Sequence, residues 1–117
     1  MTLTDYEKVL KAAADPARAR MLKLLEGREL CVCEMMEVLG LGQSTISGHL
    51  AMLKKAGLVA ARRDGRWVHY SLSASKSNQY ARPLLALMLG WLEDDARVRA
   101  DRRRLAVILE KASGKCN

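Results

Sequence analysis

Hydrophobic side chains recur along most of this chain at the spacing of amphipathic helices. In residues 4–14 they are Tyr6, Val9, Leu10, Ala13 and Ala14, and in the following segment they are Met21, Leu22, Leu24 and Leu25. Between the two segments, Asp15-Pro16 offers an N-cap followed by a proline at the first helical position, and Gly27 ends the second run. The pattern therefore predicts two consecutive helices at the start of the chain.

Two further helices are predicted to lie close together in the sequence. The first runs from about Cys31 to Leu39, and the second begins at Gln43 or Ser44, after a glycine-containing turn, and spans residues 43–57. In the second helix Ile46, Leu50 and Leu53 repeat at turn spacing and are expected to face inward. The polar residues at its start are then exposed: Gln43, Ser44, Thr45, Ser47 and His49.

A β-hairpin is predicted over residues 58–72. Two runs of β-forming residues, 58–63 and 66–72, flank Asp64-Gly65, a dipeptide typical of two-residue hairpin turns. Arg62 and Arg63 precede this turn and Arg66 follows it. The hairpin therefore carries positive charge beside its turn.

Residues 78–112 are again helical in pattern, with a boundary at Glu93-Asp94-Asp95 and a last helix from Ala96 to Ala112. Before this boundary, large apolar side chains form a face that one small domain would struggle to cover: Leu84, Leu87, Met88, Trp91 and Leu92. Such a face is typical of a subunit interface, so we expect a homodimer. Nothing in the pattern suggests a repeat or a linker, and we expect one domain over residues 1–117.

Composition narrows the choice of partner. The 117 residues carry a formal net charge of +7, which favours a polyanionic partner, with nucleic acid ahead of a membrane surface. The longest apolar run, residues 84–89, is far shorter than the roughly 20 residues that span a bilayer. The amino terminus also lacks the features of a signal peptide, so we expect a cytoplasmic protein with no membrane role.

The order of helix, short helix, turn, helix and hairpin is that of a winged helix-turn-helix, a mainly α fold with a β-hairpin wing. The chain resembles the ArsR family of metalloregulatory repressors in four segments: Asp15-Pro16-Ala17-Arg18, Glu29-Leu30-Cys31-Val32-Cys33, residues 44–50 and residues 65–70. The resemblance covers residues 5 to about 95, and Glu29 to Cys33 is similar to the arsenic-responsive branch. It implies a homodimeric repressor that binds double-stranded operator DNA.

The predicted DNA contacts come from two places. Short polar side chains at a helix start can reach base edges and phosphates, which selects Gln43, Ser44, Thr45, Ser47 and His49. The resemblance adds the wing arginines Arg62, Arg63 and Arg66, which would follow the phosphates or a minor groove. In the alternative interpretation, Ser44 only caps the helix, His49 is a partly buried turn residue and the arginines are merely solvated.

Cys31 and Cys33 are the candidate ligands for trivalent arsenic or antimony, the inducers that the resemblance implies. Residues i and i+2 of a regular helix do not face each other, so we expect joint binding to bend or unwind the first turn. A helix amino terminus is also expected to lower the pKa of a thiol there. The alternative is a pair of small buried side chains without a ligand.

The third ligand is open. Arsenite and antimonite prefer three thiolates, and arsenic-responsive relatives carry a third cysteine where this chain has Met36. Cys116 is one candidate, from the same chain or from the partner's tail. A monosubstituted arsenical such as methylarsenite has only two exchangeable positions and needs no third thiol.

Other functions are less well supported. The chain has no histidine after His69, so the zinc site of zinc-sensing relatives is not predicted. It also has no phosphate-binding glycine loop, no Cys-x-x-Cys and no convincing pair of nucleophile and base, which argues against an enzyme. The remaining alternatives are a thiol-based redox repressor that uses the same cysteines, a dithiol enzyme that turns over a thiol substrate, and a constitutive architectural DNA binder.

Overall fold

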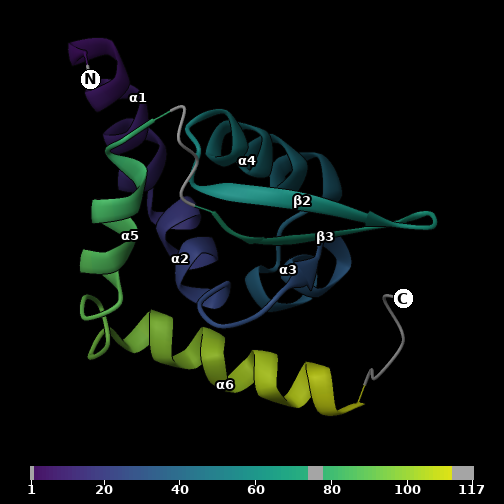
Figure 1. Cartoon of the computed structure of the whole chain (residues 1–117). Helices are drawn as coiled ribbons and strands as arrows, with labels where there is room; N and C mark the ends of the chain where they lie inside the picture. Colours follow the sequence, from purple (N-terminus) through teal and green to yellow (C-terminus); the bar gives the residue numbers. More distant parts are fainter. Residues whose placement is uncertain (1, 74–77, 112–117) are drawn as a thin grey trace.

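The computed structural model describes residues 2–73 and 78–111. In chain order the elements are α1 (Leu3–Ala14), α2 (Pro16–Leu24), β1 (Leu30–Cys31), α3 (Val32–Leu39), α4 (Gln43–Lys55), β2 (Val59–Asp64), β3 (Trp67–Leu72), α5 (Ala81–Met88) and α6 (Ala96–Lys111). Figure 1 shows α4 on one side of the β2–β3 hairpin, α3 on the other, and α6 along the far edge. The predicted mainly helical fold with a hairpin wing is confirmed.

The helices begin and end where short-range signals in the sequence place them. The Thr2 hydroxyl accepts a hydrogen bond from the Asp5 amide at 3.1 Å and thereby caps α1. The Asp15 carboxylate accepts one from the Arg18 amide at 3.1 Å, and Pro16 opens α2 as predicted. Gly40 ends α3 with φ at 68°, in the left-handed region that favours glycine.

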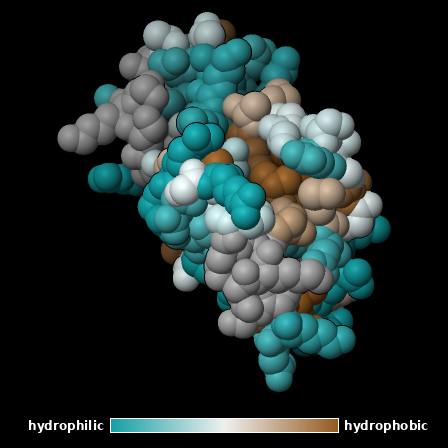
Figure 2. Space-filling model, turned by 90° about the vertical axis from the view of Figure 1, so that its right-hand side faces the viewer, coloured by the Kyte–Doolittle hydropathy of each residue, from teal (hydrophilic) through white to brown (hydrophobic). Residues whose placement is uncertain are grey.

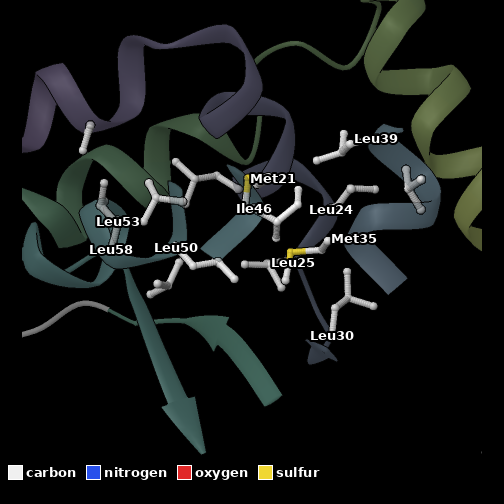
Figure 3. Close-up of a cluster of buried hydrophobic side chains, with 14 of the residues drawn as sticks. Met21, Leu24, Leu25, Leu30, Met35, Leu39, Ile46, Leu50, Leu53 and Leu58 are labelled. Atoms are coloured by element: carbon white, nitrogen blue, oxygen red, sulfur yellow. The ribbon is translucent and has the colours of Figure 1, made fainter. Parts of the chain in front are cut away.

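A single hydrophobic core lies between α2, α3, α4 and the base of the hairpin (Figure 3). Ile46, Leu50 and Leu53 of α4 are fully buried in it, as their spacing predicts. Each buried side chain of this size contributes about 1.5–3 kcal/mol to folding. Because this face of α4 is fixed inward, its opposite face is held outward.

The sheet has three antiparallel strands in the order β1-β3-β2, one more than the predicted hairpin. The additional strand is Leu30–Cys31, where the sequence predicts the start of a helix at Cys31. In the register of the sheet, Cys31 pairs with His69, and His69 pairs on its other side with Arg62. One row of the sheet therefore joins the cysteine segment to both strands of the wing.

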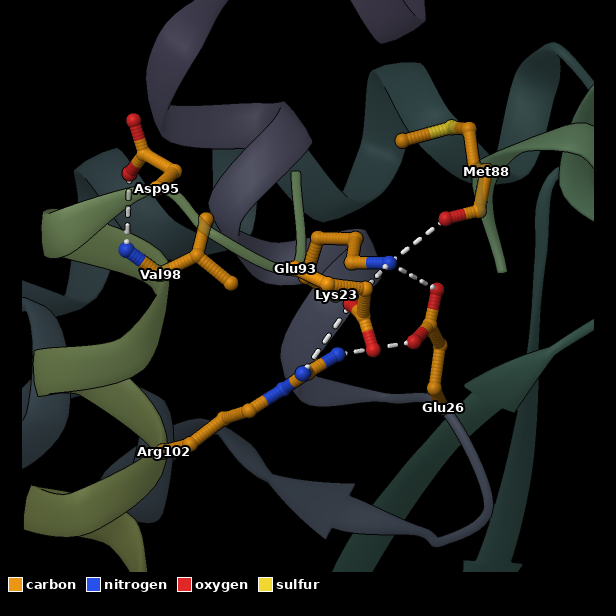
Figure 4. A network of polar contacts seen from close by, with 7 residues as sticks. All are labelled: Lys23, Glu26, Met88, Glu93, Asp95, Val98 and Arg102. Atoms are coloured by element: carbon orange, nitrogen blue, oxygen red, sulfur yellow. Dashed lines mark hydrogen bonds and ion pairs between the residues drawn. The ribbon is translucent and has the colours of Figure 1, made fainter. Parts of the chain in front are cut away.

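Helix α6 is attached to the rest of the chain by polar contacts. The Arg20 guanidinium donates two hydrogen bonds of 2.8 Å to the buried Asp101 carboxylate. The Arg104 Nε donates to the Glu37 carbonyl of α3 at 2.9 Å. A further network around the buried Lys23 joins α2 to the end of α5 and to α6 (Figure 4).

The apolar residues near α5 divide into two groups. Met88 is only 5% exposed and belongs to the core of its own chain, and Leu84 is half-buried against that core. The side chains that do reach the surface are Leu87, Trp91 and Leu92, together with Leu89. The helix ends at Met88, so Trp91 and Leu92 lie in the turn that follows, where Leu92 has a φ of 64°. The exposed part of the predicted interface is therefore smaller than the sequence suggested.

Within residues 2–73 and 78–111, no helix is both long and apolar enough to cross a bilayer. Cys116, Ala112 and the tail after Gly114 lie outside the described residues.

Candidate functional site

The sulfurs of Cys31 and Cys33 lie 3.1 Å apart at the start of α3. Cys31 is the N-cap of this helix, in an extended conformation with φ at −94° and ψ at 168°, and the Glu34 carboxylate accepts a 2.9 Å hydrogen bond from its amide. The expectation that the first turn must unwind before both sulfurs can face one ligand is therefore wrong. It assumed that both residues lie inside a helix, and Cys31 does not.

Cys31 is buried, with 3% of its surface exposed. Burial raises the pKa of its thiol above the ordinary value, and the nearby Glu34 carboxylate acts in the same direction through its charge. The expectation that the helix amino terminus lowers this pKa is wrong, because loss of solvation outweighs the hydrogen bonds from the backbone of Glu34 and Cys33, which lower the pKa. At neutral pH Cys31 is therefore a thiol.

A cavity of about 330 Å³ opens beside the two sulfurs. Its other lining side chains are mainly apolar: Val32 and Met36 from α3, and Trp67 and Val68 from β3. Gln43, the first residue of α4, and Arg66, in the wing turn, also line it. Figure 2 shows the side of the molecule toward which the wing turn points, and there hydrophobic side chains gather between hydrophilic ones.

The donor set beside the cavity is small. Met36 lies where a third cysteine would be expected, and its thioether is a weak ligand compared with a thiolate. Among the residues that the structure describes, no cluster of three or more His, Cys, Asp or Glu side chains could hold a metal ion. The described part of the site therefore fits a centre that takes two sulfur ligands.

The start of α4 is presented to solvent. Gln43, Ser44, Thr45 and Ser47 are exposed, while Ile46 between them is fully buried. The N-cap is Gly42, which makes no side-chain hydrogen bond, so the interpretation of Ser44 as the cap is wrong. The first turn of α4 therefore presents short polar side chains beside a helix amino terminus, an arrangement suited to phosphates and base edges.

His49 differs from the other four candidates because it is half-buried and has a partner in α2. Its Nδ1 lies 3.3 Å from an Arg18 nitrogen, and a guanidinium can only donate, so Nδ1 accepts and Nε2 carries the proton. Arg18 also donates to the Ala12 carbonyl at 2.8 Å. His49 therefore helps to hold α4 against the α1–α2 junction, which favours the partly buried interpretation.

The three wing arginines are exposed, and two of them have partners within the chain. Arg62 forms a two-pronged ion pair with Glu29, at 2.7 and 3.1 Å, and the Arg66 guanidinium lies 5.8 Å from the centre of the Trp67 ring. The hydrogen bond from Arg62 lowers the pKa of the Glu29 carboxyl and in turn raises the pKa of Arg62. Sequence reasoning missed Glu29, although it lies in the same motif as the cysteines.

Comparison with known proteins gives a consistent set of relatives. The family model described as "Bacterial regulatory protein, arsR family" matches residues 15–61. The arsenic resistance transcriptional regulator ArsR2 of Pseudomonas putida is 39% identical over 92 residues, which cover 75% of this chain and 80% of that protein. ArsR1 of the same organism is 53% identical over 66 residues, 55% of this chain, and this match spans only about half (51%) of that protein's length.

Other relatives have different names. A CadC homolog of Staphylococcus aureus, named as a cadmium resistance regulatory protein, is 40% identical over 70 residues, which cover 58% of this chain and 57% of that protein. Among solved structures, the winged helix-turn-helix DNA-binding domain of Mb0332 from Mycobacterium bovis, described as homodimeric, matches with a TM-score of 0.63 and 33% identity. That match covers 74% of this chain and 77% of the other.

Proposed function

Because the chain belongs to the arsR family of bacterial regulatory proteins, whose matched members are DNA-binding transcriptional regulators and not enzymes, we propose that it is a homodimeric repressor. In this proposal it binds operator DNA in the cytoplasm and leaves it when trivalent arsenic or antimony binds Cys31 and Cys33. The observation that carries the proposal is the 3.1 Å separation of the two sulfurs at the start of the helix that precedes α4.

The DNA-binding part rests on α4 and the wing. The exposed start of α4 presents Gln43, Ser44, Thr45 and Ser47, which would read base edges and phosphates in a major groove. The wing presents Arg62, Arg63 and Arg66, and the formal net charge of the chain is +7. Phosphate contacts of this kind supply affinity that depends strongly on salt.

The inducer chemistry needs no change of oxidation state. In the reduced protein each of the two thiols gives its proton to a hydroxide on the trivalent arsenic, so that two As–S bonds form, two As–O bonds break and two water molecules leave. A centre with bonds to sulfur of about 2.3 Å, a length typical of metal thiolates, can contact both sulfurs at their observed separation. The third position keeps its hydroxide or takes the Cys116 thiol.

Burial of Cys31 is consistent with this choice of inducer. The adduct of two thiols with arsenous acid is uncharged, whereas cadmium and zinc bind thiolates and generally require more ligands. The raised pKa of the Cys31 thiol disfavours a free thiolate but does not disfavour a neutral adduct. This argument favours arsenic or antimony over the metal in the CadC relative's name.

Two routes connect the sulfurs to the DNA-binding elements. The backbone of Cys31 pairs with His69 of the wing, and α3 leads through residues 40–42 into α4. To move a repressor from about 99% to about 1% binding-competent, the inducer must favour the released form by about 5.5 kcal/mol. We propose that a centre bound to both sulfurs acts through these two routes and disfavours the DNA-bound arrangement of the wing and of Gln43 to His49.

The proposed dimer would use the exposed apolar side chains near α5. Leu87, Trp91 and Leu92 are 55%, 48% and 43% exposed, and Leu89 is 58% exposed. A second copy of the chain would remove this surface from water. Two operator half-sites one helical turn apart would also be bound by the two subunits of a dimer.

The experiment is DNA binding by fluorescence anisotropy, with reduced protein and a duplex selected from a random library. Arsenite, antimonite and methylarsenite are expected to release the DNA, whereas zinc, cadmium and peroxide are not. Cys31→Ser and Cys33→Ser should abolish release and leave DNA binding intact. Cys116→Ser should have a smaller effect, largest for arsenite and least for methylarsenite.

Three outcomes would contradict the proposal. A full arsenite response in Cys33→Ser would remove the dithiol from the mechanism. Release by peroxide and not by arsenite would support the redox alternative. DNA binding that no compound alters would support a constitutive architectural binder.

A further inference from the structure

We propose that the cavity beside Cys31 and Cys33 receives the organic substituent of a monosubstituted trivalent arsenical and prefers an aromatic ring to a methyl group. This inference rests on the proposed function, because the two thiols must first hold the arsenic. It goes further by assigning a role to apolar residues of the wing strand that no DNA contact explains.

The chemistry of a monosubstituted arsenical matches the two sulfurs. In the compound R–As(OH)₂ both hydroxides exchange for thiols, two water molecules leave, and the As–C bond and the oxidation state of the arsenic are unchanged. No third thiol is needed, which agrees with Met36 at the position of the third cysteine. The substituent remains on the arsenic and must be accommodated next to the sulfurs.

The cavity has the size and lining for such a group. Its volume of about 330 Å³ lies within the range of roughly 300–1,000 Å³ that is common for small-molecule sites. Trp67 offers an aromatic face for ring stacking, and the Met36 thioether can contact the edge of a ring. Val32 and Val68 complete an apolar lining that an arsenic-bound hydroxide would not use.

The position of the cavity gives the substituent access to both DNA-binding elements. Gln43 is the first residue of α4, Arg66 lies in the wing turn, and both line the same cavity as the cysteines. A ring in this cavity would therefore touch the start of α4 and the wing at once. A larger substituent should release DNA at a lower concentration than a smaller one.

The test compares phenylarsine oxide, which hydrates in water to a dihydroxide, with methylarsenite. Both have two exchangeable positions, so they differ only in the substituent. Affinities for reduced protein are measured by calorimetry, and their ratio is divided by the same ratio for a free small dithiol. Burial of an aromatic ring should make the phenyl compound about 10 to 100 times tighter after this correction.

The fluorescence of Trp67 gives a second measure of whether the cavity is occupied. The phenyl compound should change the tryptophan emission of the wild-type protein, and the change should disappear in Trp67→Phe, since Trp67 lines the cavity. An emission change that survives in Trp67→Phe would place the ring elsewhere.

A variant that fills the cavity with a side chain tests whether the substituent binds there. Val68→Phe keeps a β-forming residue in β3 and should remove most of the corrected phenyl preference. Val107→Phe, on the exposed side of α6, adds the same ring away from the cavity and should keep the preference.

The outcomes separate this inference from the proposed function. Equal corrected affinities for the two compounds, or a preference that Val68→Phe leaves unchanged, would overturn the cavity assignment while the dithiol site stands. Failure of folded, reduced protein to bind either compound would overturn both.

Discussion

Lys23 is a lysine with almost no contact with water, and its replacement tests how the end of α5 and Glu93 are held against α2. Its side chain is 1% exposed, and its ammonium donates to the Met88 carbonyl and forms ion pairs with Glu26 at 2.9 Å and Glu93 at 3.0 Å. Arg102 of α6 contacts the same two carboxylates, at 2.9 and 3.0 Å (Figure 4). Lys23→Met removes the charge and keeps the length of the side chain, so that it opens little cavity.

The expected loss of stability in Lys23→Met follows from the contacts that are lost and those that remain. The Met88 carbonyl would lose one of its two donors and keep the Trp91 amide at 3.0 Å, so the main cost is the removal of one partner from a buried ion pair, about 3–5 kcal/mol. Because Arg102 still neutralises part of the carboxylate charge, we expect Lys23→Met to lower the free energy of unfolding by about 2–4 kcal/mol. For a chain of this length, that corresponds to a fall in Tm of roughly 8–16 °C.

The measurement is urea and thermal unfolding, with Lys8→Met as the control because Lys8 is exposed on α1. The control should stay within about 0.5 kcal/mol of the wild type. Amide exchange at the end of α5 should also accelerate in Lys23→Met, since Lys23 no longer donates to the Met88 carbonyl there. A Lys23→Met protein as stable as the wild type would show that desolvation of the ammonium cancels its contacts, which would refute this reasoning.

The contribution of Lys23 to stability should depend on pH. The hydrogen bond from Lys23 holds the pKa of the Glu93 carboxyl below its ordinary value. A carboxyl with a lowered folded-state pKa stabilises the fold above its unfolded pKa, and this contribution is lost as the pH falls through the lowered value. The difference between the wild type and Lys23→Met should therefore narrow in acid.

Four further predictions concern DNA binding and the thiol. Glu29→Gln should tighten DNA binding by freeing Arg62 for phosphates, and Arg62→Ala should weaken binding to selected and random duplexes alike; anisotropy that shows neither change would contradict the role of this pair. Binding by a dimer that makes about 6–10 phosphate contacts should weaken by roughly 10³–10⁵ between about 50 and 200 mM salt, and a flat response would exclude those contacts. The rate of alkylation of Cys31, measured by mass spectrometry of its peptide, should be low at neutral pH and should still rise when the pH exceeds the ordinary pKa of a thiol. A rate that reaches its plateau at a pH below that value would show that burial does not control the pKa. Trp91→Glu should give monomers with little operator affinity in light scattering and anisotropy, and dimers of unchanged affinity would place the interface elsewhere.

The parts of the fold that follow from short-range signals were predictable. Asp15-Pro16 caps α2, Gly40 ends α3, and Gly65 opens the wing turn at a φ of 63°. This turn consists of Gly65 and Arg66, one residue later than the predicted Asp64-Gly65, because Asp64 still pairs with Trp67. Each of these features depends on the conformation of two to four neighbouring residues, so the sequence carries the information locally. The buried face of α4 was equally accessible, because Ile46, Leu50 and Leu53 repeat at helical spacing.

The features that were missed or misjudged depend on distant residues. Leu30–Cys31 is a strand only because β3, almost 40 residues later, offers a partner, and two residues carry no periodic signal of their own. The raised pKa of Cys31 results from its burial in the folded chain. Met88 is apolar like its neighbours, and only the packing of α5 decides which of them faces inward.

The candidate site was predictable in composition but not in arrangement. The two cysteines, the polar start of α4 and the basic wing were all apparent from the sequence. Their connections were not, because Arg62 pairs with Glu29 and His49 with Arg18 across more than 30 positions of the chain. The cavity combines residues from α3, α4 and the wing strand, and no local pattern can indicate such a combination.

The row of the sheet joins Cys31 to His69 and Arg62, so bound DNA should also affect how tightly Cys31 holds its ligand. If a ligand on Cys31 weakens the hold of the wing on DNA by some factor, then bound DNA must weaken that ligand by the same factor, because the coupling free energy belongs to both equilibria. The inducer concentration at which the protein responds is then not a property of the protein alone. A cell with more operator copies, or with lower ionic strength, would need more arsenic to obtain the same release, and free protein would act as the more sensitive pool.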